Sequence, residues 1–334
     1  MYDLIIKPTQ LCNFRCSFCS SSDIAQDNET LSLNTLFNFL KNNDIGRIII
    51  NGGDPLMMPP EYYTSILNFL DKNGMSTRLS FTTNLWDYYN NPSKWEKIFK
   101  EDRVGVCTSF QYGGQRKLCN NEPLTEEIFI DIMNSFYEHI GYMPMFISVI
   151  TDENENDVIR TAKLAKSMRT ECKINPSMQS GRSHTYYPLY KAYSKYLDII
   201  EEGLSQYEFN SKEIVKLYQN TKTICPYNRN CVNTIRCMSP DGTLHSCGCF
   251  NDDYKYNKKN GKKTYELDKY DADTLSKDYK YIHAKCLECD LFALCNSCYK
   301  HIHDIKTNRD ESEHCSNMQS IKDRLVKILC KQCI

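Results

Sequence analysis

The segment YDLIIKPTQLCNFRCSFC, residues 2–19, contains a short apolar run followed by three closely spaced cysteines. The cysteines have the spacing C-x3-C-x2-C and are Cys12, Cys16 and Cys19. Three thiolates can hold three corners of a [4Fe–4S] cube and leave the fourth iron open to a ligand that is not protein. A closed zinc site would need a fourth Cys or His nearby, but the next cysteine is Cys107 and the next histidine is His139. The spacing therefore favours an open iron–sulfur cluster over a zinc loop or a set of buried thiols.

Strand and helix patterns alternate on the C-terminal side of this segment. Short runs rich in β-branched and aromatic residues predict strands at 2–7, 47–52, 78–84, 104–110, 145–151 and 172–177. Amphipathic stretches between them predict helices at 32–43, 59–72, 125–139 and 154–169. Repeated βα units produce a parallel sheet, so the expected fold class is α/β with a partial (β/α)6 TIM-like barrel. In such barrels functional residues gather at the carboxyl ends of the strands.

The composition favours a reduced, intracellular protein. The chain has 334 residues and 18 cysteines, and such a number is typical either of disulfide scaffolds or of metal sites. The start MYDLIIKPTQ lacks the features of a signal peptide, and no apolar run approaches the roughly 18 to 20 residues of a membrane span. We therefore expect a cytoplasmic protein without a membrane partner. A net charge of −1 argues against a nucleic-acid partner.

One local exception to this balanced charge is the lysine-rich segment KYNKKNGKK, residues 255–263. Its simplest interpretation is a solvated insertion loop, and the alternative is a patch that steers an acidic peptide or leader.

The segment CNFRCSFC resembles the cluster loop of the radical S-adenosylmethionine (SAM) superfamily. In that family the open iron chelates SAM, and one electron from the cube cleaves SAM to methionine and a 5′-deoxyadenosyl radical, which abstracts hydrogen from the substrate. The segment NGGDP after the second strand stands at the place of the family's Gly-Gly-Glu-Pro motif, with Asp54 instead of the commoner Glu. The resemblance implies SAM contacts at Asn51, Gly52, Gly53, Asp54, Asn84, Ser109, Gln111 and Arg182.

Several of these residues also have simpler interpretations. Ser109 and Gln111 occupy the place where relatives read Ser-Leu-Asp-Gly and contact the SAM ribose, but Ser109 could equally lie in a turn. Asn84 could cap a helix, and Arg182 could be a surface arginine rather than a cation near the SAM carboxylate.

The second half of the chain resembles the SPASM extension, a cysteine-rich domain with two auxiliary [4Fe–4S] clusters in peptide-modifying radical SAM enzymes. By motif position, the first auxiliary cluster would be held by Cys225, Cys231, Cys247 and Cys298. The second would be held by Cys286, Cys289, Cys295 and Cys315. The last pair is spaced C-x2-C, whereas the family usually has three intervening residues. Two zinc sites of four cysteines each are the alternative.

The cysteines without a cluster assignment are Cys107, Cys119, Cys172, Cys237, Cys249, Cys330 and Cys333. Those in predicted strands, Cys107 and Cys172, are expected to be buried thiols that behave as small hydrophobes. Cys249 is a candidate hydrogen-atom donor to a substrate radical, or else a structural thiol. The C-terminal pair Cys330 and Cys333 has metal-pair spacing in a tail segment, where an inert role is expected and a redox or cluster role is the alternative.

The resemblance implies a barrel at residues 1–185, a helical linker at 186–220, a SPASM-like domain at 221–316 and a C-terminal helix and tail at 317–334. Sulfatase maturases carry a catalytic Asp at the position of Gly248, so that particular activity is not expected here. A barrel that begins at residue 2 also lacks an N-terminal leader-binding module, so a separate leader-binding protein is a possible partner.

The expected function is a radical SAM oxidoreductase that oxidises or cross-links a ribosomally made peptide through a thioether or C–C bond. The implied cofactors are SAM and three [4Fe–4S] clusters, and the implied electron donor is a low-potential protein such as flavodoxin or ferredoxin. One alternative is radical dehydrogenation or epimerisation of a small molecule or a peptide residue. Another is a non-catalytic iron–sulfur or zinc scaffold. The sequence identifies neither the substrate nor the atom abstracted nor a general acid or base.

Overall fold

The computed structural model describes the chain in segments, which are residues 2–21, 28–181, 183, 185–218, 234–245, 247–259, 288–289, 291–295, 300, 304–305 and 309–332. The chain divides into two compact units. The first comprises Met1–Phe146, Ser180–Ser183 and Val232–Tyr270. The second comprises Ile147–Gln179, His184–Cys231 and Asp271–Ile334.

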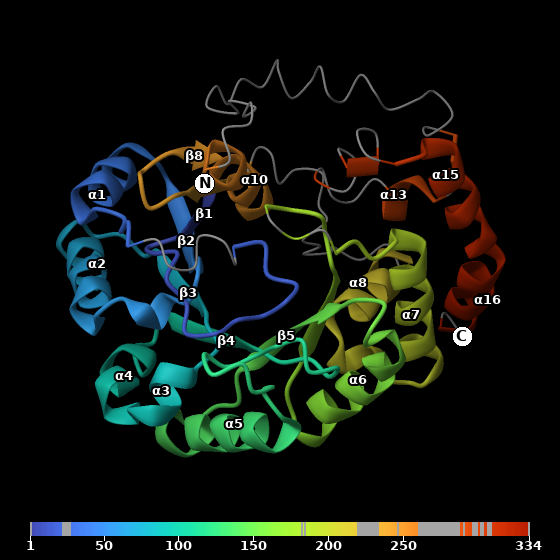
Figure 1. Ribbon diagram of the computed structural model, residues 1–334, viewed down its shortest axis with the longest axis horizontal. Helices are drawn as coiled ribbons and strands as arrows, with labels where there is room; N and C mark the ends of the chain where they lie inside the picture. Colours follow the sequence, from blue (N-terminus) through green and yellow to red (C-terminus); the bar gives the residue numbers. More distant parts are fainter. Residues whose placement is uncertain are drawn as a thin grey trace. The chain divides into compact units, whose positions relative to one another are not determined.

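A mainly parallel sheet forms the centre of the first unit (Figure 1). Its strands are β1 (Tyr2–Ile6), β2 (Ile45–Ile50), β3 (Arg78–Thr82), β4 (Val104–Ser109), β7 (Ile235–Met238) and β8 (Leu244–His245). Their order is β4-β3-β2-β1-β7-β8, and only the β7–β8 pairing is antiparallel. In the register of β1, Ile6 lies opposite both Ile50 and Met238. The carboxyl ends of these parallel strands therefore meet at one edge of the sheet.

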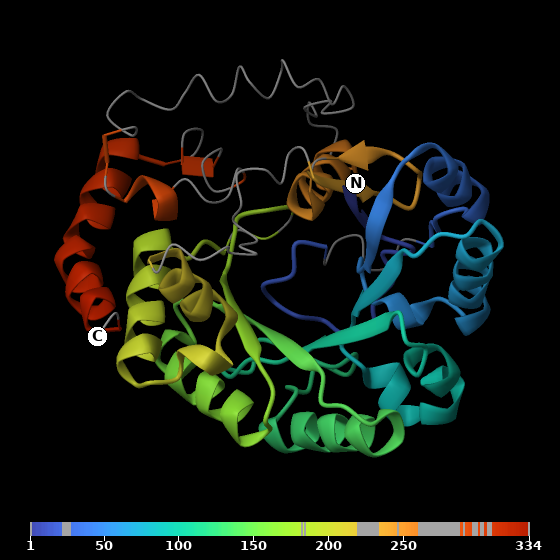
Figure 2. The same ribbon diagram turned by 180° about the vertical axis from the view of Figure 1, so that it is seen from behind.

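Helices cover the outer face of these strands (Figures 1 and 2). They are α1 (Leu33–Asn42), α2 (Pro60–Lys72), α3 (Trp86–Asn90), α4 (Pro92–Phe99) and α5 (Glu126–Ile140), with the short η1 (Pro55–Met57) before α2. An aromatic core fills the space beneath them, in which Tyr63 and Phe99 both pack edge-on against Phe81 of β3. Another helix, α10 (Gly248–Lys259), follows β8 and contacts the residue after β1 through its Asp252. The sequence analysis predicted no helix at α3 or α4. The five residues of α3 are too few for a clear helical period, but α4 buries Trp95, Ile98 and Phe99 at helical spacing after Pro92, a signal that was missed.

The second unit contains most of β5 (Met145–Ile150), which lies beside β6 (Cys172–Pro176), and a set of helices. The helical segments are η2 (Glu155–Asp157), α6 (Val158–Ser167), α7 (Leu189–Glu201), η3 (Ser205–Tyr207), α8 (Phe209–Tyr218), α13 (Phe292–Cys295), α15 (Glu311–Ser320) and α16 (Lys322–Gln332). The buried carboxylate of Glu208 accepts backbone N–H groups from Ile174 of β6 and from Asn210 and Ser211 at the start of α8. Arg324 of α16 donates to Asp198 on α7 at 2.5 Å.

The six predicted strands and four predicted helices are all present, with ends shifted by a few residues. The chain has the expected α/β fold with the parallel strands of a partial barrel. Two details differ from expectation. The predicted helix at the C-terminus is two helices separated at Ile321, and the lysine-rich segment begins inside α10 rather than in a loop. Within the described segments, no helix has the length and apolar character needed to cross a membrane.

Candidate functional site

The loop that carries Cys12, Cys16 and Cys19 follows β1 and is fixed by backbone hydrogen bonds to the segment after β4. Arg15 N–H donates to the Lys117 carbonyl at 2.7 Å, and Ser17 N–H donates to the Gln115 carbonyl at 3.0 Å. Cys19 N–H donates to the Cys16 carbonyl at 3.3 Å within the loop. The first two bonds join segments that follow β1 and β4, two strands of the same sheet that are not adjacent, so the cysteine loop extends past the ends of β2 and β3.

The three thiols are half-buried, and their surroundings suit metal-bound thiolates. Burial raises the pKa of Cys19 to about 11 and raises that of Cys12 further. Without a metal the thiols of Cys12 and Cys19 would stay protonated at neutral pH, so a positive partner such as cluster iron is needed to make them thiolates. Hydrogen-bond donors for such sulfurs are present, since Phe14 N–H lies 3.4 Å from Cys12 Sγ and Arg116 Nη1 lies 3.9 Å from Cys16 Sγ.

In the described residues, no three His, Cys, Asp or Glu side chains converge as they would around a single metal ion. A cube is larger than one ion, and each thiolate binds its own iron. The finding on single-ion sites therefore does not count against a [4Fe–4S] cluster, and Cys12, Cys16 and Cys19 stay its predicted ligands.

The glycines of NGGDP allow the turn after β2 to lie against the backbone that leads into Cys12. A Cβ atom on Gly53 would lie 2.1 Å from the Leu11 carbonyl oxygen, and one on Gly52, whose φ is +125°, would lie 2.4 Å from the Thr9 carbonyl oxygen. Gly53 N–H donates to Thr9 and Asp54 N–H donates to Leu11, at 3.1 and 2.8 Å. The glycines thus have a role in addition to the expected approach to SAM, since they bring two strand ends together.

Asp54 is 2% exposed, and its carboxylate is bound within the protein. It accepts the N–H groups of Leu56 at 2.9 Å and Asn84 at 2.7 Å, and the Thr83 hydroxyl at 2.9 Å. Burial raises its pKa to about 6, although these hydrogen bonds act in the opposite direction. The side chain of Asp54 therefore connects the β2 turn to the end of β3, and its backbone remains next to the cysteine loop.

Asn84 contacts both the cysteine loop and the start of α3. Its Nδ2 donates to Asn13 Oδ1 at 2.7 Å, and its Oδ1 accepts Trp86 N–H at 2.9 Å. The helix-cap interpretation and the interpretation as part of the site are therefore both compatible with its geometry. Asn51 directly follows β2, and its Oδ1 is buried without a hydrogen-bond partner among the described residues.

The segment after β4 brings a buried cation to the loop. Ser109 is half-buried at the end of β4, and Gln111 is fully buried. Arg116, 8% exposed, has its Nη2 at 3.5 Å from Gln111 Oε1 and its guanidinium 5.2 Å from the Phe18 ring centroid. The sequence analysis missed Arg116, although a basic residue seven positions after the predicted Ser109 contact was an available signal. Arg182, the predicted cation, lies outside the described residues.

Two predicted cysteines lie at the start of α10, in the same unit as the cysteine loop. Cys247 precedes the helix and Cys249 lies on its first turn. A hydrogen bond to Cys247 and burial together raise the pKa of the Cys249 thiol well above its ordinary value. Ser180 Oγ donates to the Cys249 carbonyl at 2.8 Å. The described site thus has Cys249 next to the proposed ligand Cys247.

In the second unit, three predicted ligands of the second auxiliary cluster are described. Cys289 accepts from Gln319 Nε2 at 3.3 Å, and Cys295 Sγ lies 3.1 Å from His314 Nε2. Cys315 is exposed on α15, directly after His314. The remaining predicted ligands lie outside the described residues, and they are Cys225, Cys231, Cys286 and Cys298. Cys107 and Cys172 are buried, as expected for strand thiols. Of the C-terminal pair, only the backbone of Cys330 is described, within α16, and Cys333 lies outside the described residues.

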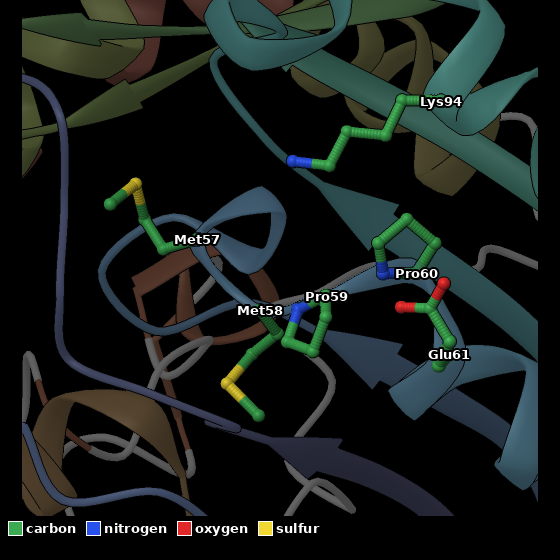
Figure 3. A pocket seen from close by; sticks show the side chains of 6 residues that line it. All are labelled: Met57, Met58, Pro59, Pro60, Glu61 and Lys94. Atoms are coloured by element: carbon green, nitrogen blue, oxygen red, sulfur yellow. The ribbon is translucent and has the colours of Figure 1, made fainter.

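A surface pocket of about 530 Å³ lies between η1, α2 and α4 (Figure 3). Its lining residues are Met57, Met58, Pro59, Pro60, Glu61 and Lys94. None of them is a predicted site residue. The Lys94 ammonium is paired with Asp87 at 2.8 Å, so the pocket has no unpaired cation of its own.

Comparison with known proteins agrees with this arrangement. Residues 6–165 match the radical SAM superfamily. This part of the chain is therefore a radical SAM domain. No curated protein matches the sequence.

Solved structures share the fold over almost the whole chain. Polyhistidine-tagged anSMEcpe with bound AdoMet is 15% identical, with 98% of this chain and 95% of that chain covered and a TM-score of 0.71. Native anSMEcpe with bound AdoMet and Kp18Cys peptide is 14% identical, with coverages of 98% and 99% and a TM-score of 0.70. Streptococcus suis SuiB bound to precursor peptide SuiA is 16% identical, with coverages of 92% and 73% and a TM-score of 0.61.

Proposed function

We propose that this radical SAM enzyme abstracts hydrogen from a ribosomally made peptide and leaves it oxidised or cross-linked. The observation that carries the proposal is the loop of three half-buried thiols, packed against the glycine turn and next to the Arg116 guanidinium. When bound, SAM and a reduced cluster supply the radical that removes the hydrogen atom.

The residues of the chain have separate tasks in this proposal. Cys12, Cys16 and Cys19 hold the cluster, while Asn51 and the two glycines line the strand end where SAM would bind. Ser109 and Gln111 would contact its ribose. Arg116 stabilises negative charge at the cluster loop, because its guanidinium is buried beside Cys16 and its Nε has no hydrogen-bond partner among the described residues.

A peptide substrate is supported by analogy with structural neighbours. Structures of anSMEcpe contain the Cp18Cys and Kp18Cys peptides, and a structure of SuiB contains its precursor peptide SuiA. These are properties of those proteins, and likeness of fold does not transfer a substrate. A small-molecule substrate is therefore the alternative within the same chemistry.

The fate of the substrate radical depends on the second half of the chain. We propose that a SPASM-like domain at 221–316 holds two auxiliary clusters. The ligands of the first would be Cys225, Cys231, Cys247 and Cys298. The ligands of the second would be Cys286, Cys289, Cys295 and Cys315. An oxidised auxiliary cluster would accept an electron and give a thioether or C–C bond. Return of a hydrogen atom from Cys249 would give epimerisation instead. A low-potential flavodoxin or ferredoxin would supply electrons in the cytoplasm, with a separate protein as leader binder.

The test is anaerobic reconstitution followed by measurement of 5′-deoxyadenosine formed from SAM and dithionite. We expect product with the wild type and none with Cys16→Ala, which lacks one cluster ligand. Three clusters predict about 12 iron ions per chain, since each cube holds four. If the wild type binds no SAM and forms no 5′-deoxyadenosine, the enzyme proposal fails and a scaffold takes its place. Zinc in place of auxiliary iron would overturn the cluster count only.

A further inference from the structure

A buried ion pair joins Lys7, the residue after β1, to Asp252 on α10. Their side chains are 4% and 9% exposed. Taking two charges out of water is costly, and their attraction offsets that cost only when other polar groups complete the hydrogen bonding. The other hydrogen-bond partners of Lys7 and Asp252 therefore indicate which segments the ion pair joins.

On the carboxylate side, the additional partners belong to the cysteine loop. Ser20 Oγ donates to Asp252 Oδ2 at 2.6 Å, and Ser21 Oγ donates to Oδ1 at 3.2 Å. Ser20 directly follows Cys19, the third ligand of the proposed SAM cluster. Asp252 thus binds Ser20 and Ser21, here called the cluster-loop exit, through two charge-assisted hydrogen bonds.

On the ammonium side, the additional partner belongs to the auxiliary-cluster segment. Lys7 Nζ donates to the Gly248 carbonyl at 3.2 Å, and Gly248 directly follows Cys247. A Cβ atom on Gly248 would lie 3.9 Å from the same ammonium, so the lysine packs against this residue. The backbone N–H of Lys7 also donates to Met238 of β7 at 2.9 Å.

A third segment, the turn at Ser180 and Gly181, also contacts both Ser20 and the start of α10. Gly181 N–H donates to Asp253 Oδ1 at 2.7 Å, and a Cβ atom on Gly181 would lie 2.4 Å from the Ser20 carbonyl oxygen. With a φ of +54°, Gly181 adopts a left-handed conformation that few other residues tolerate. The cluster-loop exit, the Ser180–Gly181 turn and the start of α10 are therefore closely packed together.

We propose that Lys7 and Asp252 are a positioning pair that sets the place of Cys19 relative to Cys247. One ion pair binds the residue after a SAM-cluster ligand and the residue after an auxiliary-cluster ligand, so it holds the two metal-binding segments at a constant separation. Neither residue touches the reacting atoms. This inference rests on the proposed function, because Cys19 and Cys247 must be cluster ligands for the separation to have a consequence.

The test uses two variants of the full chain, reconstituted anaerobically. Lys7→Met/Asp252→Leu removes both charges together, which avoids an unpaired buried ion and preserves folding. Ser20→Ala/Ser21→Ala leaves the ion pair in place and removes only the two hydrogen bonds between Asp252 and the cysteine loop. Lys94→Met is the matched control, because it removes a Lys–Asp pair of the same unit whose side chains are 40% and 26% exposed.

The readouts are iron content, the thermal unfolding midpoint, the dissociation constant of SAM, and the electron paramagnetic resonance spectrum and power saturation of the reduced protein. We expect both variants to retain iron and unfold near the wild-type midpoint. We expect their SAM affinity to fall by about tenfold, as for lost outer contacts of metal sites. The cluster signal should also saturate at a different microwave power, because magnetic coupling between clusters depends on their separation.

The outcomes separate this inference from the proposed function. If the wild type binds iron and SAM but both variants keep its affinity, spectrum and saturation, the pair only stabilises the fold and the inference is wrong. If Lys7→Met/Asp252→Leu fails to fold, the SAM affinity and power saturation of Ser20→Ala/Ser21→Ala by themselves decide whether the inference holds. If the wild type itself binds neither iron nor SAM, the proposed function fails and the inference fails with it.

Discussion

Two regions next to the cysteine loop each contain a buried aspartate, and the two carboxylates are stabilised differently. In the turn after β2, Asp54 accepts two backbone N–H groups and the Thr83 hydroxyl. Among the described residues, no Lys or Arg side chain is paired with it. At the start of α10, Asp252 binds the Lys7 ammonium and two serine hydroxyls. Both connect distant segments to the loop, but only the α10 region does so with a compensated charge.

The difference teaches that a buried carboxylate can join segments in two ways. One way makes stability depend on pH, and the other makes it depend on the presence of a counter-ion. Neutral donors leave the charge of Asp54 under-stabilised, so burial raises its pKa to about 6 and the region responds to pH. The ammonium of Lys7 compensates the charge of Asp252, so the α10 region depends instead on keeping both partners. The predictions below test this contrast.

The largest effect is expected for Asp252→Asn. The substitution keeps the size of the side chain but leaves the Lys7 ammonium buried without its counter-ion, which costs about 3–5 kcal/mol. Asp54→Asn is the matched variant, and it should cost less at pH 7 because it removes a charge that has no cation. Denaturant unfolding of both variants measures the difference. Equal losses for the two would show that the contrast between the regions is wrong.

Gly53→Ala should be nearly as damaging to the β2 turn. Its Cβ would lie 2.1 Å from the Leu11 carbonyl oxygen, so the backbone must move, at a cost of about 3 kcal/mol. Iron incorporation at the cysteine loop should fall as well. Gly105→Ala in β4 is the control, because nothing lies within 4 Å of its Cβ. A wild-type melting curve for Gly53→Ala would refute the close approach.

The pH dependence of stability should differ between wild type and Asp54→Asn. Because the folded-state pKa of Asp54 is raised from 3.8 to about 6, the folded protein binds this proton more tightly than the unfolded chain does. The resulting stability is fully present below pH 3.8 and is lost as the pH rises through about 6. The wild type should therefore lose roughly 3 kcal/mol relative to the variant across this window.

The measurement is the free energy of unfolding of both proteins at several pH values between 3.5 and 7. Groups other than Asp54 contribute equally to both curves and cancel in the difference. A difference that stays constant with pH would mean that Asp54 titrates normally.

The smallest effect is expected for Thr83→Val, which keeps the shape of the side chain and removes its hydroxyl. Asp54 loses one donor and Leu85 N–H loses an acceptor at 3.1 Å, which costs about 1–2 kcal/mol. The loss of a donor should also raise the pKa of Asp54 further. An unchanged pH profile in the Thr83→Val protein would contradict the network. Thr77→Val, whose hydroxyl donates to the Ile45 carbonyl away from Asp54, is the control.

Local patterns in the sequence determined the secondary structure and the cluster loop. The strands β1 to β6 are short runs of β-branched and aromatic residues, and the spacing of Cys12, Cys16 and Cys19 predicts an open cluster without reference to the rest of the chain. Both signals are local, since strand propensity and chelate spacing depend on neighbouring residues. The helix α3 escaped prediction because it has five residues and buries only Tyr88, whereas α4 had an available signal in Pro92 and in the helical spacing of its buried residues.

Only the tertiary structure revealed how the loop is held. Lys7 and Asp252 are 245 residues apart, and Arg116 lies 100 residues beyond Cys16. Asp54 matches a motif position in sequence, but its buried carboxylate bonds to Thr83 and Asn84. Long-range pairs such as these follow no sequence period, because the folded sheet brings together strand ends that the chain keeps far apart. The sequence by itself therefore determined which thiols form the loop, and the fold determined which charges and hydrogen bonds fix it in place.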